Sequence, residues 1–385
     1  MHTVTVLRRG ALRLRGGHPW VFRSDLRDMG GAEPGAIVRV QDERGAFLGC
    51  AFHSSSELSL RLLDRGMIED ERAFFGERLR ASIVRRAPLL ATRDAARLVH
   101  GESDGLPGLL VDRFGDGLVI QSLCQAMDQR EDMLVGMLVD LCGPRVVALR
   151  DDGSTRDHEG LERRKALVRG DDARVTYHEG SLEYRIDLLE DQKTGAYLDQ
   201  ADNHVHAGTL ARGRALDLFT YHGGFGLQLA LGAERVACVD IGESAAARTA
   251  ENARANGLSN VEVHCANAFD LVRALEGEKA RFDTIVIDPP AFAKRKSALD
   301  GARRGYKDLN LRAMRLLAPE GTLVTCSCSG KMTRALFEDM LVDAARDTGR
   351  RMVVQERRGA GPDHPVLLGV PETEYLKCFV LRAVD

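Results

Sequence analysis

Residues 214–226, Arg-Ala-Leu-Asp-Leu-Phe-Thr-Tyr-His-Gly-Gly-Phe-Gly, decide the fold that we expect. Residues 214–219 have the pattern of a buried strand, and the glycines that follow let the backbone turn tightly and approach a ligand before a helix begins. The same order of strand, loop and helix repeats from about residue 189 onward, with further strands expected at 235–240, 282–287 and 321–328 and a helix at 243–256. Alternating strands and helices indicate an α/β fold with a doubly wound, mostly parallel, Rossmann-like sheet.

The sequence before residue 189 predicts different elements of secondary structure. Residues 1–73 hold short, glycine-punctuated strand segments typical of a small β-barrel. A helix is expected over residues 69–87, and strands on both sides of a Gly115-Asp116-Gly117 turn, with a helix near 127–142, indicate a central α+β domain. We therefore expect three domains, which cover residues 1–73, 74–188 and 189–385.

Composition narrows the class of protein. With 385 residues, 44% apolar and 29% charged, the chain does not match collagen-like, disordered or disulfide-scaffold proteins. No apolar run approaches the roughly 20 residues of a membrane helix, and the N-terminus does not resemble a signal peptide, so we expect a cytoplasmic protein without membrane contact. The eight cysteines include no C-x-x-C pair, so no metal site is expected.

A local basic patch stands out against the net charge of −3. Only Asp25 opposes the arginines in this first stretch of sequence, which are Arg8, Arg9, Arg13, Arg15 and Arg23. Such a patch either binds phosphates or forms a solvated face, and the sequence leaves both interpretations open.

The glycine loop and the next expected strand predict a nucleoside-bearing cofactor. The loop lacks the G-x-G-x-x-G spacing, so it does not favour NAD. Asp240 follows Gly223 by 17 positions, where Rossmann-like folds place a carboxylate on the ribose hydroxyls, although Asp240 could instead be the N-cap of the next helix. Asp217 is either a structural acid or a contact to the amino-acid end of the ligand, and Asn267 is either an adenine-side contact or a turn residue.

Two strand ends carry the residues expected to do chemistry. Asp288-Pro289-Pro290 ends an apolar strand, and this pattern is typical of methyl transfer to nucleobases or amides, with a plain proline turn as the alternative. The next strand ends at Cys326-Ser327-Cys328, and Cys328, nearer the end, is the better nucleophile candidate. If the two strands are neighbours, Cys328 and Asp288 face one pocket.

These motifs together resemble the RlmI-type ribosomal large-subunit RNA cytosine-C5 methyltransferases, over nearly the whole chain. The resemblance rests on residues 190–203 (Glu-Asp-Gln-Lys-Thr-Gly-Ala-Tyr-Leu-Asp-Gln-Ala-Asp-Asn), the Asp217 loop, and residues 288–292, 305–308 and 327–330. Residues 9–22 resemble the family's N-terminal PUA module, residues 102–109 its central domain, and residues 363–365 and 374–377 also match.

The resemblance implies methylation of cytosine C5 in 23S ribosomal RNA, with S-adenosylmethionine as cofactor. Cys328 would be the nucleophile that adds to cytosine C6, and Asp288 the acid at the base edge. Cofactor contacts would come from Lys193, Thr194, Tyr197, Asp199, Gln200, Asp217, Phe219, Gly223, Asp240, Asn267 and Asp288, and RNA contacts from Arg8, Arg9, Arg13 and Arg15. Two positions depart from the family pattern: His222 replaces a small hydroxyl residue and Asn267 an acid.

Two other functions stay open at this point. Asp-Pro-Pro-Ala-Phe at 288–292 also resembles motifs that hold an exocyclic amine for N-methylation, a reaction that needs no thiol at Cys328. A non-catalytic RNA-binding assembly factor with a vestigial cofactor pocket is the second alternative. Ribosomal RNA is the expected partner, and a homodimer is left open.

Overall fold

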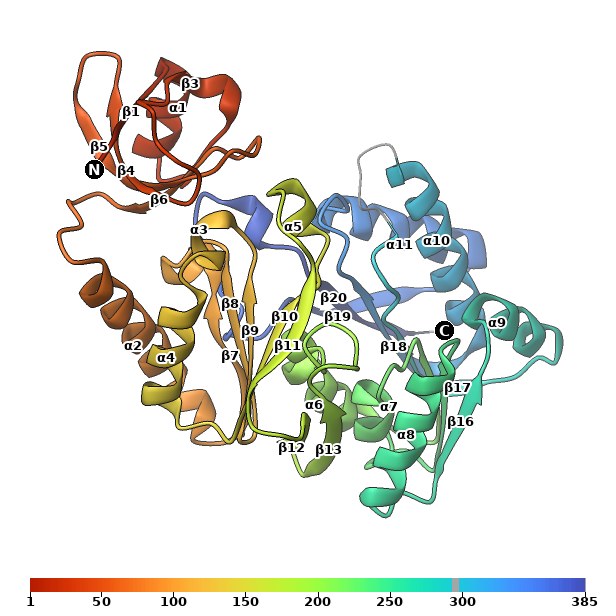
Figure 1. The fold of residues 1–385 in the computed structure, drawn as a ribbon. Coiled ribbons are helices and arrows are strands. Elements are labelled where there is room, and N and C mark those ends of the chain that lie inside the picture. The colour runs from red at the N-terminus through yellow and green to blue at the C-terminus, as the bar shows by residue number, and fades with distance from the viewer. Residues whose placement is uncertain (293–297, 385) are drawn as a thin grey trace. The chain divides into compact units, whose positions relative to one another are not determined.

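The computed structural model describes residues 1–292 and 298–384, and Figure 1 shows its ribbon. The chain divides into two compact units, each built from segments that are far apart in the sequence. Unit 1 comprises Met1–Tyr177, Ile186–Ala196 and Asp363–Thr373, and unit 2 comprises His178–Arg185, Tyr197–Pro362 and Glu374–Asp385. The division into domains at 1–73, 74–188 and 189–385 stays a prediction.

Unit 1 begins with a small β module, as expected. Its six-stranded sheet has the order β2-β6-β5-β4-β1-β3 and is mixed, because β1 runs parallel to β4 and antiparallel to β3. The strands are β1 (Thr3–Val6), β2 (Trp20–Val21), β3 (Leu26–Asp28), β4 (Ile37–Asp42), β5 (Phe47–His53) and β6 (Leu60–Asp64). Buried and partly exposed residues alternate along β4, as a strand with one face on a core requires.

The arginine-rich stretch of this module forms a helix, α1 (Arg8–Arg15), which the sequence pattern did not reveal. Gly10, Ala11 and Leu14 are its buried residues, so its apolar face is short and the charged residues dominate its sequence.

The rest of unit 1 contains a five-stranded sheet with the order β11-β10-β9-β8-β7. Its strands are β7 (Ala95–His100), β8 (Leu109–Phe114), β9 (Gly117–Ser122), β10 (Val146–Asp151) and β11 (Arg164–Arg169). Helix α2 (Glu71–Leu90) begins where the Asp70 side chain accepts a hydrogen bond from the Ala73 amide, and it packs with α4 (Glu131–Cys142) on this sheet. The expected helix, hairpin and α+β composition are confirmed.

Unit 2 is a doubly wound α/β sheet of seven strands with the order β16-β15-β14-β17-β18-β20-β19. Its strands are β14 (Arg214–Leu218), β15 (Arg235–Asp240), β16 (Val261–Cys265), β17 (Phe282–Ile287), β18 (Leu317–Ser327), β19 (Met352–Arg358) and β20 (Lys377–Ala383). All neighbours pair in parallel except β20, which is antiparallel to both β18 and β19. The predicted fold class is confirmed.

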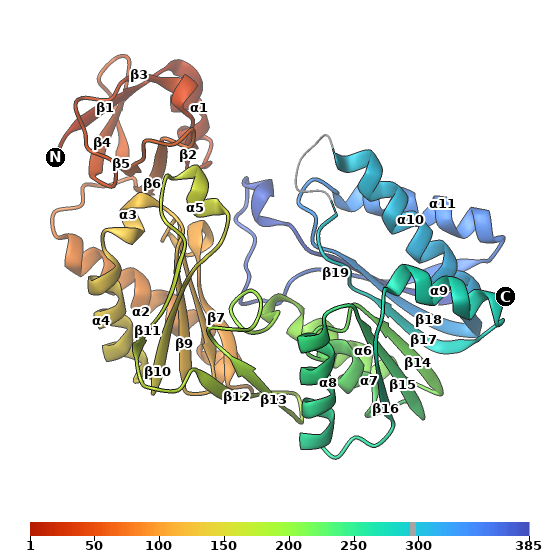
Figure 2. The ribbon, with the colours of Figure 1, turned by 45° about the vertical axis from the view of Figure 1, so that its right-hand side comes forward.

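Helices cover both faces of this sheet (Figure 2). Helices α6 (Ala201–Leu210) and α7 (Gly224–Leu229) share an apolar core with one face, which includes Ala215 and Val286. Helices α9 (Ala268–Gly277), α10 (Leu299–Leu316) and α11 (Arg334–Thr348) share another core with the opposite face, which includes Leu216 and Ile285. Because successive strand residues point to opposite faces, both faces of β14 and β17 are buried.

The remaining elements are β12 (Arg174–Glu179) and β13 (Leu182–Asp187), which pair as a two-stranded sheet, and α3 (Gln125–Asp128), α5 (Thr155–His158) and α8 (Glu243–Ala255). Within residues 1–292 and 298–384, no helix has both the length and the apolar composition needed to cross a bilayer.

Candidate cofactor and nucleophile site

The predicted cofactor residues of unit 2 gather where the strand order of the sheet reverses. Strand β14 lies between β15 and β17, although β15 and β16 separate β14 from β17 along the chain. Open α/β sheets bind ligands at the carboxyl ends of the strands beside such a switch point. Asp217 lies near the end of β14, Asp240 ends β15, and Asp288 follows β17 directly.

The loop from β14 to α7 holds an unusual backbone conformation. Phe219 and Tyr221 have positive φ angles of 68° and 51°, and Gly223 has a φ of 90°. A left-handed conformation costs a non-glycine residue roughly 1–2 kcal/mol, so neighbouring contacts must hold it. The amides of Phe219 and Thr220 both donate to the Val239 carbonyl at 2.9 Å, which ties the loop to β15.

Asp240 shapes this loop through both of its carboxylate oxygens. Oδ2 accepts from the Tyr221 amide and Oδ1 from the Gly242 amide, each at 2.9 Å. The N-cap of α8 is Gly242, so the alternative that Asp240 is the N-cap is wrong. The acid instead joins the end of β15 to the glycine loop, and it remains partly exposed.

Asp217 is fully buried under the same loop. The Thr220 hydroxyl donates to its Oδ2 at 2.6 Å, while Oδ1 has no hydrogen-bond partner among the described residues. Burial raises the pKa of Asp217 to about 6, with a further increase from the charge of Asp240 and an opposing contribution from Thr220. A buried carboxylate oxygen without a partner is costly, and a ligand that donates a hydrogen bond to it would remove that cost.

Asp288 carries a raised pKa at the end of β17. Burial is the main cause, His204 and the Gln200 side chain lower the value, and the charges of Asp199 and Asp217 raise it, with a result of about 7. Near neutral pH this carboxyl is therefore protonated about half of the time and can donate a proton.

Cys328 lies directly after β18, beside the Asp-Pro-Pro turn. Strands β17 and β18 are parallel neighbours, as expected, and Cys328 Sγ lies 3.9 Å from the Pro289 carbonyl oxygen. Cys328 is partly exposed, whereas Cys326 is fully buried opposite Cys378 of β20. Burial raises the pKa of Cys326 well above its usual range, so of the two thiols Cys328 is the accessible one.

Tyrosines and a buried histidine surround these acids. Partial burial raises the pKa of Tyr197 above its usual range, and the charges of Asp288 and Asp199 add to that increase. The Tyr375 hydroxyl donates to Asp199 Oδ2 at 2.6 Å. His204 Nδ1 lies 2.6 Å from Glu179 Oε1, and although burial opposes it, this carboxylate raises the pKa of His204.

Sequence reasoning missed the Glu179–His204 pair and gave no role to Tyr375. Glu179 and His204 come from separate elements, β12 and α6. A histidine and an acid at that separation give no local signal, and only the fold brings them together.

Two predicted cofactor residues have other contacts in the structure, and a third belongs to unit 1. The Thr194 hydroxyl donates to Asp112 Oδ2 at 2.7 Å within unit 1, to which Lys193 also belongs. Asn267 is the N-cap of α9 and accepts from the Phe269 and Asp270 amides, as its turn-residue alternative implied. The cofactor roles of Lys193, Thr194 and Asn267 stay predictions.

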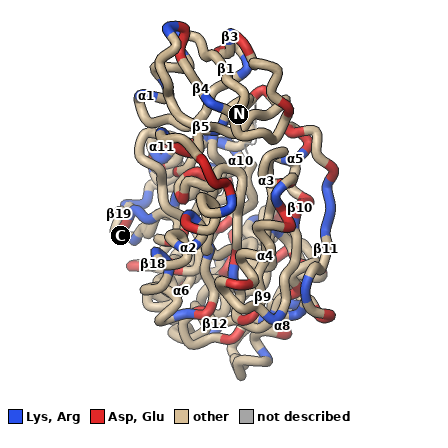
Figure 3. The backbone as a smooth tube through the Cα atoms, turned by 60° about the vertical axis from the view of Figure 1, so that its left-hand side comes forward, with Lys and Arg blue, Asp and Glu red and all other residues tan. Residues whose placement is uncertain are grey.

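Three of the four arginines of α1 form ion pairs, and Figure 3 marks the Lys and Arg positions along the backbone in blue. Arg9 and Arg13 form ion pairs with the buried Asp25, and Arg15 pairs with Asp42 at 2.5 Å. Asp25 is the acid within this stretch of sequence, and the fold adds a second one, Asp42 at the end of β4. Arg8 is exposed, and no carboxylate partner for it lies in the described part of the chain.

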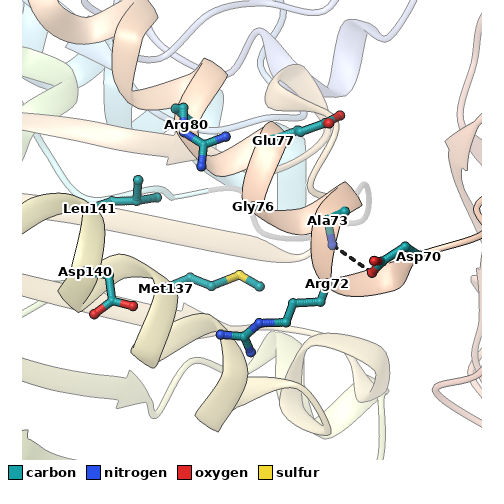
Figure 4. Close-up of a pocket in the computed structure, with 9 residues that line it drawn as sticks. All are labelled: Asp70, Arg72, Ala73, Gly76, Glu77, Arg80, Met137, Asp140 and Leu141. Carbon is teal, nitrogen blue, oxygen red and sulfur yellow. Dashed lines mark hydrogen bonds between the residues drawn. The ribbon is translucent and has the colours of Figure 1, made fainter.

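A pocket of about 500 Å³ lies between α2 and α4 of unit 1 (Figure 4). Its lining is a mixture of acids, arginines and apolar side chains: Asp70, Arg72, Ala73, Gly76, Glu77, Arg80, Met137, Asp140 and Leu141. None of these is a predicted site residue. The charges are of both signs, so the pocket has no clear preference for an anionic or a cationic ligand.

Unit 1 also contains three neighbouring carboxylates, those of Asp128, Glu131 and Asp151. The Arg164 guanidinium contacts all three, at 2.7–3.3 Å. The positive charge of Arg164 thus already offsets the negative charge of these carboxylates. This arrangement is consistent with an ion-pair network within unit 1 rather than with a metal site.

Comparisons with known proteins agree with this geometry. Residues 171–381 match the family model of S-adenosylmethionine-dependent methyltransferases, and residues 4–65 match that of PUA-like domains. The "Ribosomal RNA large subunit methyltransferase I" of Tolumonas auensis is 38% identical, over 95% of this chain and 96% of its own. The chain belongs to this methyltransferase family. The protein of the same name from Photobacterium profundum is 39% identical, over 95% of each chain.

Solved structures show that the methyltransferase shares its fold with more distant proteins. "A putative sam-dependent methyltransferase from Streptococcus mutans" has a TM-score of 0.85 at 19% identity, and the match covers 99% of this chain and 100% of that one. A structure described as a methyltransferase complexed with SAH has the same TM-score at 20% identity, with the same coverage.

The residues of the methyltransferase site fit S-adenosylmethionine. This cofactor carries a positive sulfur, an ammonium group and ribose hydroxyls, all of which suit acidic acceptors. Asp217 offers an unpartnered buried oxygen, and the partly exposed Asp240 lies at the neighbouring strand end. The charges of Asp199 and Asp217 also raise the pKa of Asp288.

Proposed function

We propose that this methyltransferase methylates cytosine C5 in large-subunit ribosomal RNA through a covalent adduct with Cys328. The observation that carries the proposal is an accessible thiol directly after β18, 3.9 Å from the carbonyl oxygen of the residue that follows Asp288. Amine methylation requires no nucleophile there. The name of the 38–39% identical relatives supports ribosomal RNA as the substrate.

The reaction begins with activation of the cytosine ring. Cytosine C5 is a poor nucleophile, so the Cys328 thiolate adds to C6, forms an S–C6 bond and opens the C5–C6 double bond. Asp288 donates its proton to N3 and so neutralises the charge that builds on the ring. Bound S-adenosylmethionine supplies the methyl group, which C5 takes as the cofactor becomes neutral S-adenosylhomocysteine.

The second half of the reaction restores the ring. A base removes the C5 proton, the C5–C6 double bond re-forms, and the C6–S bond breaks to return the thiolate. The Asp288 carboxylate then takes back the N3 proton, and the base releases the C5 proton to solvent, so that the protein ends in its starting protonation state. A carboxyl with a pKa of about 7 suits both directions of this transfer.

We assign the cofactor to the acids at the strand ends. Asp240 would accept from the ribose hydroxyls and the free oxygen of Asp217 from a donor of the cofactor. Lys193, Thr194, Tyr197, Asp199, Gln200, Phe219, Gly223 and Asn267 complete the proposed cofactor-binding set. The PUA-like module would bind RNA phosphates through Arg8, Arg9, Arg13 and Arg15. A cytoplasmic location follows from this substrate, and the homodimer stays open.

RNA carrying 5-fluorocytidine at the target tests the mechanism, because fluorine blocks the final elimination and traps the adduct. Wild-type protein and Cys326→Ser should both form a covalent complex on a denaturing gel. Cys328→Ser should form none and should lose methylation, since a hydroxyl is scarcely ionised at neutral pH. Methylation at the normal rate by Cys328→Ser would refute the C5 mechanism and favour amine methylation at Asp288-Pro289-Pro290.

A further inference from the structure

Lys377 is a buried lysine at the start of β20, with 2% of its surface exposed. In the antiparallel pairing of β18 and β20 it lies opposite Ser327, the last residue of β18. The return of the chain along β20 therefore brings an ammonium group to the strand end that carries Cys328.

The contacts of the ammonium are directed at the segment around Cys328. Nζ donates to the Ser329 carbonyl at 2.7 Å and to the Tyr375 carbonyl at 2.8 Å. A lysine ammonium has three N–H donors, so one remains beyond these two bonds. The Ser329 carbonyl belongs to the residue next to Cys328. The Lys377 ammonium therefore lies against the backbone segment that carries the Cys328 thiol.

A buried ammonium without an anionic partner is costly. In the described part of the chain, no carboxylate lies within ion-pair distance of Lys377. Burial lowers the pKa of Lys377 to about 8, and the charge of Cys328 acts in the opposite direction. The anion that would balance this ammonium is thus the Cys328 thiolate.

We propose that Lys377 is a positioning residue that stabilises the thiolate of Cys328 and so increases the fraction of nucleophile available for addition. The proposal rests on the proposed function for its role in catalysis, but not for its effect on the thiol. The thiol proton leaves to solvent, and Lys377 acts through its charge without exchanging a proton with the thiol.

Three described groups near this turn, Tyr306, Asp288 and Tyr197, carry no positive charge. Tyr306 donates or accepts within a hydroxyl cluster with Ser327 and Ser329, and burial raises its pKa. Asp288 and Tyr197 disfavour a neighbouring anion when they ionise. Arg334 and Glu374 affect Lys377 with opposite signs, and they form an ion pair with each other at 2.9 Å.

The rate at which iodoacetamide alkylates Cys328, measured against pH by peptide mass spectrometry on the full chain, tests the proposal. Alkylation follows the thiolate, so its midpoint reports the thiol pKa. Lys377→Met keeps the aliphatic stem and should raise the midpoint by about 1 pH unit, the lower end of the effect of an opposite charge. Lys377→Arg keeps the charge and should stay closer to the wild type than to Lys377→Met.

Lys331→Met is the matched control. Lys331 is exposed and only three residues from Cys328, so its loss should leave the midpoint unchanged. A wild-type midpoint at or above about 8.5, the ordinary cysteine value, would overturn the proposal without any variant, even if Lys377→Met fails to fold. An equal midpoint in wild type and Lys377→Met would also overturn it.

The same experiments separate this inference from the proposed function. If the midpoint does not move but Cys328→Ser cannot methylate, the nucleophile stands and the role of Lys377 falls. If the midpoint moves as expected but Cys328→Ser methylates normally, Lys377 does stabilise the thiolate and the C5 mechanism falls.

Discussion

Replacing Asp288 by asparagine should change how stability depends on pH. The fold raises the pKa of this carboxyl from 3.8 to about 7. Between these values the folded state holds a proton that the unfolded state has lost, so the stability of the wild type falls as pH rises through this window. Asparagine does not titrate, and the variant lacks this dependence.

The size of the effect follows from the pKa values. Between pH 5 and about pH 7 the folded carboxyl binds one proton that the unfolded carboxyl has lost. Each of these roughly two pH units changes the free energy of unfolding by about 1.36 kcal/mol. Because Asp288 is partly exposed, we reduce the sum to about 2 kcal/mol. Relative to Asp288→Asn, the wild type should therefore lose about 2 kcal/mol of stability between pH 5 and pH 8.

Hydrogen exchange of the β17 amides measures this loss of stability in unit 2, which contains Asp288. The single tryptophan, Trp20, lies in unit 1 and cannot report on β17. Intrinsic exchange rates cancel when both proteins are compared at the same pH, so the wild-type to variant ratio gives the stability difference directly. We expect this ratio to rise about 30-fold from pH 5 to pH 8, and an unchanged ratio would show that Asp288 has an ordinary pKa.

Three further changes test other parts of the protein. Asp240→Ala should weaken S-adenosylmethionine binding in calorimetry by roughly 1.5–3 kcal/mol, with Asp240→Asn affected less because it keeps an acceptor for the loop amides. Changing Arg8, Arg9, Arg13 and Arg15 to glutamine should lower the salt dependence of RNA binding by about 0.7–0.9 per lost phosphate contact, and Arg8 alone should account for one contact. Gly223→Val should lower the protection of α7 from exchange, because φ is 90° and a Cβ would lie 2.7 Å from Leu227.

The sheet of unit 2 could be predicted because its signals are local. The bounds of β15 and β17 coincide with the apolar segments 235–240 and 282–287, where acids or prolines end each run. Helix α1 could not be predicted in this way, since its three buried residues form too short an apolar face among its arginines.

Pairings between distant segments were beyond the sequence pattern. The antiparallel return of β20 places Lys377 at the Cys328 turn, and the hydroxyl of Tyr375 reaches Asp199, 176 residues away in the chain. No periodicity encodes either contact, because each depends on which strand takes the position next to β18. The sequence could therefore propose the nucleophile but not the charge beside it.

The motif at residues 190–203 shows a different limit. Contiguity in the sequence suggested one cofactor-binding wall, yet the boundary between the units passes between Ala196 and Tyr197. Thr194 is anchored to Asp112 in unit 1, and Asp199 is anchored to Tyr375 in unit 2. A replacement such as Thr194→Val therefore removes a contact within unit 1, so its effect on cofactor binding must be separated from its effect on the stability of that unit before Thr194 is counted as a ligand.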